Sequence, residues 1–256
     1  MLNFDFFYAW TKEHLNINLE GYKEKQLQRR IGTIMKNTGA ATLEEYAVKI
    51  QSDPIVKKNF LNYITINVTD FFRNKEVFDE FEELMVSYLE PKFGALKIWS
   101  AACSTGAEAY SLAMIMTNHN IKHAEKITAT DIDETILAKA KKGIYSSVEI
   151  KNVDEKNRQN YFTQEDNAFY LSEQIKNKVA FKKHDLIGDR FGTGYNVIVC
   201  RNVTIYFKNE VKEELYQKFS DALVPGGLFF TGATETIYSP EKYGLIKRAS
   251  FIYEKI

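Results

Sequence analysis

The chain has 256 residues, and its 34 lysines and arginines balance 34 aspartates and glutamates, so the formal net charge is zero. This balance argues against non-specific nucleic-acid binding, which usually needs a strong basic excess. Hydrophobic residues make up 45% of the chain and aromatic residues 14%, which excludes disorder as the default state.

The first seventy residues predict a small helical domain without a convincing strand. Helical patterns cover residues 4–14, 19–37 and 54–66. A further helix is expected to begin at Thr42, where Thr-Leu-Glu-Glu forms a capping box.

From residue 96 onward, short apolar runs alternate with amphipathic helices, which is typical of a parallel, doubly wound α/β sheet. The expected strands are 96–102, 127–131, 179–181, 196–200 and 227–231, and the expected helices are 108–118, 134–142 and 208–223. The polar segment 145–177 breaks this alternation and is interpreted as an insertion. The tail predicts a final antiparallel pair at 245–247 and 250–253.

Several kinds of site and location are not expected. The chain shows no secretory leader and no apolar run long enough to span a membrane, so we expect a cytoplasmic protein without membrane insertion. Cys103 and Cys200 lie in apolar runs and are expected to be reduced core residues. The four histidines are scattered, so no metal site is predicted.

Ligands of open α/β sheets bind at the carboxyl ends of the strands, near the point where the strand order reverses. The first strand runs into the small residues Ala-Ala-Cys-Ser-Thr-Gly106, directly before a helix that contains Glu108. Asp131 ends the second strand, where a carboxylate is placed to accept both hydroxyls of a ribose. These residues indicate a cofactor that contains a nucleoside.

The number of glycines after the first strand helps to distinguish between nucleoside-containing cofactors. A dinucleotide site needs G-x-G-x-x-G to hold a pyrophosphate, but Gly106 stands alone. S-adenosylmethionine carries a ribose without a phosphate, and its ammonium group would pair with Glu108. Alternatively, Glu108 is only an acid favoured by the helix dipole in the first turn.

Two further clusters contain candidate residues. Arg73 closes the aromatic stretch that begins near Asn67, at the junction of the two regions, so it either snorkels from a packed helix or lines a cleft between domains. Arg201, Asn202 and Tyr206 follow the strand 196–200. Asp185 and Leu186 follow the strand 179–181 and would meet an adenine edge.

Taken in order, these motifs resemble the CheR family, the chemotaxis receptor glutamate O-methyltransferases. The resemblance spans nearly the whole chain and rests on the segments 21–30, 66–73, 98–106, 129–133 and 200–207. It implies a helical, receptor-docking domain over residues 1–70 and an S-adenosylmethionine-binding methyltransferase domain over 71–256. A small β-subdomain is expected to be inserted in the second domain at about 145–180.

The resemblance also implies the site residues. Arg73 and Tyr206 match the residues beside the reacting methyl group and are the expected catalytic residues. The expected cofactor contacts are Asn67, Thr69, Arg73, Ala102, Gly106, Glu108, Asp131, Ile132, Asp185, Leu186, Arg201 and Asn202. The implied cofactor is S-adenosyl-L-methionine, with S-adenosyl-L-homocysteine as its product and no metal.

The sequence departs from the family pattern at several positions. Ala107 and Ala109 stand where the family usually has glutamate and proline, and Asp185 replaces a more usual asparagine. Thr204 replaces a bulky apolar residue, which we interpret as a packing variation. The inserted segment lacks the glycine-containing loop of members that grip a receptor tether, so a member that uses no tether is expected.

The implied substrates are glutamates in the cytoplasmic helical domain of chemotaxis receptors, modified by a monomeric enzyme. Residues 22–36 carry five basic residues and one acidic residue, which predicts a docking helix with Lys23, Lys25, Arg29 and Arg30 as its contacts. A solvated helix face is the alternative interpretation of these charges.

Three other functions remain as alternatives. A nicotinamide dehydrogenase lacks its glycines here. A nucleic-acid methyltransferase lacks both the Asn/Asp-Pro-Pro-Tyr strand end and the Pro-Cys nucleophile. A non-catalytic adaptor that binds S-adenosylmethionine and docks to receptors is suggested only by Ala107 and Ala109.

Overall fold

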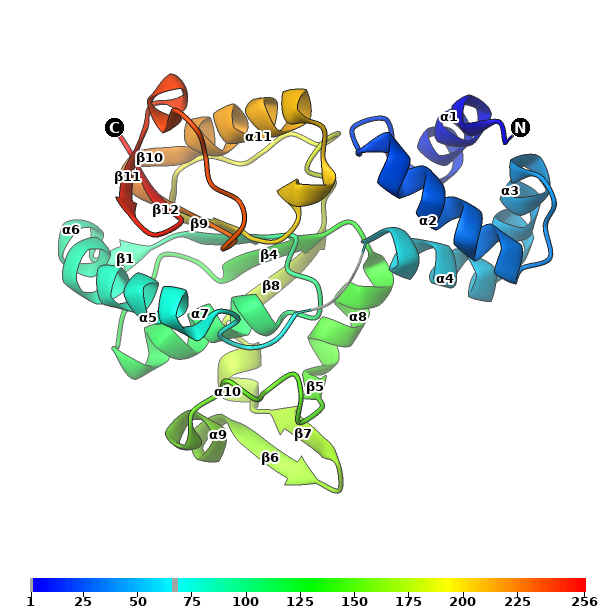
Figure 1. The fold of residues 1–256 in the computed structure, drawn as a ribbon. Coiled ribbons are helices and arrows are strands. Elements are labelled where there is room, and N and C mark those ends of the chain that lie inside the picture. The colour runs from blue at the N-terminus through cyan, green and yellow to red at the C-terminus, as the bar shows by residue number, and fades with distance from the viewer. Residues whose placement is uncertain (1, 66–68) are drawn as a thin grey trace.

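The computed structural model describes residues 2–65 and 69–256. Its first part consists of four helices: α1 (Phe4–Leu15), α2 (Glu24–Asn37), α3 (Leu43–Ser52) and α4 (Pro54–Thr65). They enclose a core of their own, in which the ring centroids of Phe7, Tyr46 and Phe60 lie 5.6 to 6.0 Å apart. This helical bundle lies to one side of the sheet, at the right of Figure 1.

The starts of these helices test local sequence signals. The capping box is confirmed, because the Thr42 side chain accepts a hydrogen bond from the Glu45 N–H at 3.2 Å. The prediction for α2 is wrong at its start, since the helix begins at Glu24 rather than near residue 19. Tyr22 instead forms an antiparallel bridge with Phe207 of the second domain, and this long-range pairing replaces the first helical turn.

The second part contains a seven-stranded sheet in the order β11-β12-β10-β9-β2-β4-β8. Its strands are β2 (Ile98–Ala101), β4 (Ile127–Asp131), β8 (Val179–Lys183), β9 (Tyr195–Cys200), β10 (Leu223–Thr231), β11 (Leu245–Ala249) and β12 (Ile252–Lys255). The five strands from β10 to β8 are parallel, and β12 is antiparallel to both β10 and β11. The chain runs outward from β2 and returns to β9, so the strand order reverses between these two strands.

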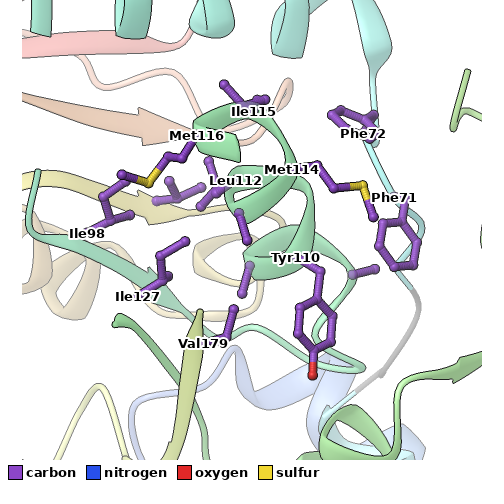
Figure 2. Close-up of a cluster of buried hydrophobic side chains, with 14 of the residues drawn as sticks. Phe71, Phe72, Ile98, Tyr110, Leu112, Met114, Ile115, Met116, Ile127 and Val179 are labelled. Carbon is purple, nitrogen blue, oxygen red and sulfur yellow. The ribbon is translucent and has the colours of Figure 1, made fainter. Parts of the chain in front are cut away.

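Helices cover both faces of this sheet, because successive strand residues point to opposite sides. Trp99, Ile198 and Phe229 pack towards α11 (Asn209–Ala222) on one face. The other face carries α7 (Ala107–Asn118), whose residues from Ala107 to Met116 are all buried. Figure 2 shows Leu112 and Met116 of this helix directed towards the strand residues Ile98 and Ile127.

The segment between the two parts also forms helices, for which no element was predicted. These are α5 (Lys75–Leu84), the π-helical turn η1 (Met85–Leu89) and α6 (Glu90–Phe93). Phe78 and Phe81 of α5 pack against Phe230 of β10, with ring centroids 5.5 and 4.7 Å apart. A short parallel pair, β1 (Ala95–Leu96) with β3 (Lys122–His123), forms a separate two-stranded sheet.

The segment that breaks the alternation folds as a small three-stranded antiparallel sheet in the order β5-β7-β6. Its elements are β5 (Ile144–Tyr145), α9 (Glu155–Tyr161), β6 (Phe162–Glu165), β7 (Ala168–Leu171) and α10 (Glu173–Lys176). It projects below the main sheet in Figure 1. The expected fold class is therefore confirmed: a doubly wound α/β sheet with a helical N-terminal part and an inserted β-subdomain.

Phe71 ties the junction between the two parts to this subdomain. Its ring packs edge-on against Tyr145, with ring centroids 4.8 Å apart, and its N–H donates to the Glu149 carbonyl at 2.9 Å.

Within residues 2–65 and 69–256, no helix has the length and apolar character needed to cross a membrane.

Candidate active site

A cavity lies at the carboxyl ends of the parallel strands, between the sheet and the helical bundle. It holds about 840 Å³ of space, including its opening to solvent. The expected site residues that line it are Thr69, Arg73, Ala102, Glu108, Asp131, Ile132, Asp185, Leu186, Arg201, Asn202 and Tyr206. Of the remaining two, Asn67 lies outside the described residues, and Gly106 is not among the described residues that line the cavity.

The turn after β2 brings backbone close to this cavity. Ala102 and Ser104 adopt left-handed backbone angles, with φ of 61° and 50°, which cost an L-residue roughly 1–2 kcal/mol each. Gly106 also has a positive φ, and a Cβ there would lie 3.0 Å from both Ala140 and Phe181. Gly106 therefore serves the turn and the packing of α7 in this structure.

Asp131 is buried at the end of β4. Its carboxylate accepts hydrogen bonds from the N–H groups of Ser104 at 2.9 Å and Asp133 at 3.1 Å. Burial raises the pKa of Asp131 to about 6, although these backbone donors oppose the rise. Asp133 has a different task, because its side chain caps the helix α8 (Glu134–Lys142).

Glu108 is buried beside Arg201 at the start of α7. One carboxylate oxygen accepts a hydrogen bond from Ser100 Oγ at 2.8 Å, and the other lies 3.7 Å from Arg201 Nη1. Burial raises the pKa of Glu108, and the charge of Arg201 opposes this rise. Glu108 therefore belongs to a buried ion pair on the cavity wall. An acid favoured only by the helix dipole would need neither this burial nor this partner.

The guanidinium of Arg201 holds the junction segment in place. Its Nη2 donates to the Arg73 carbonyl at 2.8 Å and to Asn74 Oδ1 at 3.1 Å. The same group lies over the rings of Phe78 and Phe230, 5.0 and 4.7 Å from their centroids. Arg201 thus links the loop after β9 to the segment that carries Arg73.

The helical bundle contributes cavity residues that were not among the expected site residues. Tyr22 is the main one, and its ring packs edge-on against Phe207 at 5.0 Å. Burial raises the pKa of Tyr22, with smaller contributions from Asp185 and Asp131. Tyr22 lies in the segment 21–30, which carries part of the family resemblance, but only the fold shows that Tyr22 reaches the cavity. The other lining residues outside the expected set are Ile64, Thr65, Cys103, Ser104, His184, Val203 and Phe207.

The wall of the cavity fits S-adenosylmethionine. The Asp131 carboxylate suits the ribose hydroxyls, and the Glu108 carboxylate suits the ammonium group. The Ser104 hydroxyl is buried and has no hydrogen-bond partner among the described residues, so it offers the cavity a further polar group. Ile132 and Leu186 supply apolar contacts on the same wall.

The expected docking residues divide into two groups. Lys23, Lys25 and Arg29 are exposed at the start of α2. Arg30 is only partly exposed, with its guanidinium over the ring of Tyr63, 5.2 Å from the centroid. It lines a small cavity together with Tyr206, so it lies near the candidate active site and not among the exposed residues of α2.

In the described parts of the chain, no cluster of three or more His, Cys, Asp or Glu side chains has the arrangement of a metal site.

Comparison with known proteins agrees with this geometry. Residues 2–65 match the family model described as the CheR methyltransferase all-alpha domain, and residues 67–252 match the CheR methyltransferase SAM binding domain. The fold and cavity thus define an S-adenosylmethionine-dependent methyltransferase domain behind a helical bundle. The chain belongs to the CheR methyltransferase family.

Curated relatives cover almost the whole chain. The chemotaxis protein methyltransferase of Listeria monocytogenes serovar 1/2a is 37% identical over 251 residues, covering 98% of this chain and 96% of the relative. That of Borreliella burgdorferi is 30% identical, covering 93% and 89%. That of Escherichia coli K12 is 29% identical, covering 90% and 82%.

Proposed function

We propose that the protein transfers a methyl group from S-adenosylmethionine to glutamate side chains of chemotaxis receptors, forming glutamate methyl esters. The observation that carries the proposal is the meeting of Arg73 and Tyr206 with the Glu108 and Asp131 carboxylates in one cavity. Family membership over both parts of the chain and the names of the relatives support it.

Each residue has a stated role in this proposal. Asp131 accepts the ribose hydroxyls, and Glu108 holds the ammonium group. When bound, the cofactor would supply a methyl group on a sulfonium, which a carboxylate oxygen accepts while S-adenosylhomocysteine leaves with the electron pair of the broken carbon–sulfur bond. Arg73 holds one oxygen of the substrate carboxylate so that the other oxygen faces the methyl group, and Tyr206 orients the same carboxylate.

The substrate needs no general base. The unperturbed pKa of a glutamate side chain is roughly 4.3, so the carboxylate is already ionised at pH 7. The rate therefore depends mainly on how well the carboxylate is aligned with the methyl group.

We assign receptor docking to residues 1–70 and methyl transfer to residues 71–256. The β-subdomain at about 145–180 is assigned no receptor tether.

The test uses radiolabelled S-adenosylmethionine and receptor-containing membranes. We expect label in the receptor that alkali releases as volatile methanol, because methyl esters are base-labile. Binding of S-adenosylhomocysteine with no receptor label would contradict the proposal and favour the adaptor alternative.

Arg73→Ala tests the catalytic assignment. We expect about 10²-fold slower methyl transfer, since loss of alignment has effects of this size, while S-adenosylhomocysteine still binds. Arg248→Ala is the matched control, because Arg248 lies on β11 with an exposed side chain beside Glu254. Near-wild-type activity of Arg73→Ala would remove Arg73 from the mechanism.

A further inference from the structure

A buried carboxylate outside the expected site residues holds the loop that carries Tyr206. Glu235 follows β10 and is 4% exposed. One oxygen accepts hydrogen bonds from the N–H groups of Asn202 at 2.5 Å and Gly232 at 2.9 Å. The other accepts from the N–H groups of Val203 at 3.1 Å and Thr204 at 2.7 Å.

Thr204 adds a fifth hydrogen bond, from its hydroxyl to Glu235 at 2.7 Å. This residue is one of the departures from the family pattern, and its hydroxyl gives it a role beyond the expected packing variation. Three consecutive backbone N–H groups and one side chain of the loop 202–204 therefore converge on a single carboxylate.

The loop needs such a support. Asn202 has a left-handed φ of 61°, and Asn202, Val203 and Tyr206 all line the cavity. A residue held in this conformation persists only where its surroundings enforce it. Glu235 itself is not among the described residues that line the cavity, so it acts through the loop.

The loop after β9 also packs closely against the loop after β10. A Cβ at Gly232 would lie 2.8 Å from the Asn202 nitrogen, so the two loops after β9 and β10 are in direct contact. On its other side, the loop is held by the helical bundle, because the Lys23 N–H donates to the Tyr206 carbonyl at 2.9 Å.

We propose that Glu235 is a positioning residue for methyl transfer: it sets the 202–206 loop and thereby the placement of Tyr206 towards the substrate carboxylate. The kinetic part of this inference rests on the proposed function. The structural part, in which the carboxylate restrains the loop, stands without it.

Thr204→Val is the informative variant, because it removes one hydroxyl and leaves the three backbone donors. We expect kcat for receptor methylation to fall about fivefold, with S-adenosylhomocysteine affinity within about twofold of wild type, since the loop shifts by less than the roughly 1 Å that costs about 10²-fold. Glu235→Gln should lower kcat about 10²-fold, because its amide nitrogen cannot accept the loop N–H groups.

A control separates positioning from loss of stability. Thr231→Val removes a buried hydroxyl on β10 that bonds the Phe251 carbonyl, outside the loop. This variant should keep wild-type kcat. Equal losses of kcat in Thr204→Val and Thr231→Val would overturn the proposal.

Hydrogen exchange gives a readout that needs no activity. We expect the amides of residues 202–204 to exchange slowly in the wild-type protein and faster in Thr204→Val, with no change elsewhere in the sheet. If receptor methylation were absent altogether, the proposed function would fail while this local change would persist. Unchanged exchange in both Thr204→Val and a folded Glu235→Gln would overturn the restraint itself.

Discussion

At the scale of the residue, the site is built from carboxylates that the protein has largely removed from water. Asp131 and Glu108 are both buried, and burial raises the pKa of each. The charge of Glu108 is compensated by Arg201, whereas among residues 2–65 and 69–256 the hydrogen bonds to Asp131 come from backbone N–H groups. We therefore expect a ligand that donates hydroxyl groups to stabilise the Asp131 carboxylate more than the Glu108 carboxylate.

This difference predicts a pH dependence of cofactor binding. The pKa of Asp131 is about 6 in the free protein, and the ionised form is the better acceptor for two ribose hydroxyls. Affinity for S-adenosylhomocysteine should therefore fall as the pH drops below 6, by roughly tenfold at pH 5 relative to pH 8. Isothermal titration calorimetry across this range measures the effect.

Asp131→Asn is the control for this pH dependence. Glu108 also lines the cavity, and burial raises its pKa too, so it contributes any slope that this variant retains. We expect Asp131→Asn to bind more weakly at pH 8 and to lose most of the change between pH 5 and 7. A full slope in Asp131→Asn would assign the titration to another group.

At the scale of the element, helix α2 combines an apolar side that packs into the bundle with an exposed basic side. Leu27 and Ile31 are buried, while Lys25 and Arg29 are exposed one turn apart. Glu24, the acid of this region, is paired with Lys208 of the second domain at 3.0 Å. The exposed part of α2 is thus more basic than its composition alone suggests.

Reversing the charges of Lys25 and Arg29 to glutamate should slow receptor methylation about tenfold or more at low salt, because long-range attraction to an acidic receptor surface is lost. The difference from wild type should shrink as ionic strength rises. S-adenosylhomocysteine binding should not change. Initial rates at several salt concentrations measure this.

The matched control reverses Lys242 and Lys247 instead. Both are exposed, and they lie near β11, on the opposite side of the molecule from α2 in Figure 1. The net charge changes equally in the two double variants. If both slowed methylation to the same extent, the overall charge and not the surface of α2 would be responsible.

At the scale of the whole molecule, the cavity depends on contact between the helical bundle and the sheet. The Lys208 N–H donates to the Gly21 carbonyl at 2.9 Å, next to the Tyr22–Phe207 ring contact. A Cβ at Gly21 would lie 2.8 Å from Ile187 Cδ1 and 3.3 Å from Val211 Cγ2. A larger residue at position 21 would therefore push the two parts of the cavity wall apart.

Gly21→Val should weaken S-adenosylhomocysteine binding about tenfold, because overpacking of this kind costs roughly 1–3 kcal/mol. Gly32→Val is the control within the same bundle, since the one contact within 4 Å that a Cβ at Gly32 would make with the described part of the chain is Leu2 Cδ1, at 4.0 Å. Calorimetry on both variants, with circular dichroism to verify folding, gives the answer. Unchanged affinity in a folded Gly21→Val would show that the cavity tolerates movement of the bundle.

Local patterns and the motif resemblance together predicted most of the fold and most of the residues that line the cavity. Strand and helix periodicity depends on neighbouring residues, and it correctly predicted the alternation from β2 to β10 and the capping box of α3. Motif order led to the eleven expected residues that share the cavity. These features depend on short stretches of chain, which is why a single sequence contained them.

Only the tertiary structure decided how distant segments meet. It moved the start of α2 to Glu24, because Tyr22 pairs with Phe207. It gave Arg201 its partners on the junction segment and Glu235 its place beneath the 202–204 loop. Such pairings depend on residues far apart in the chain, and the burial that makes them strong exists only once the chain has folded.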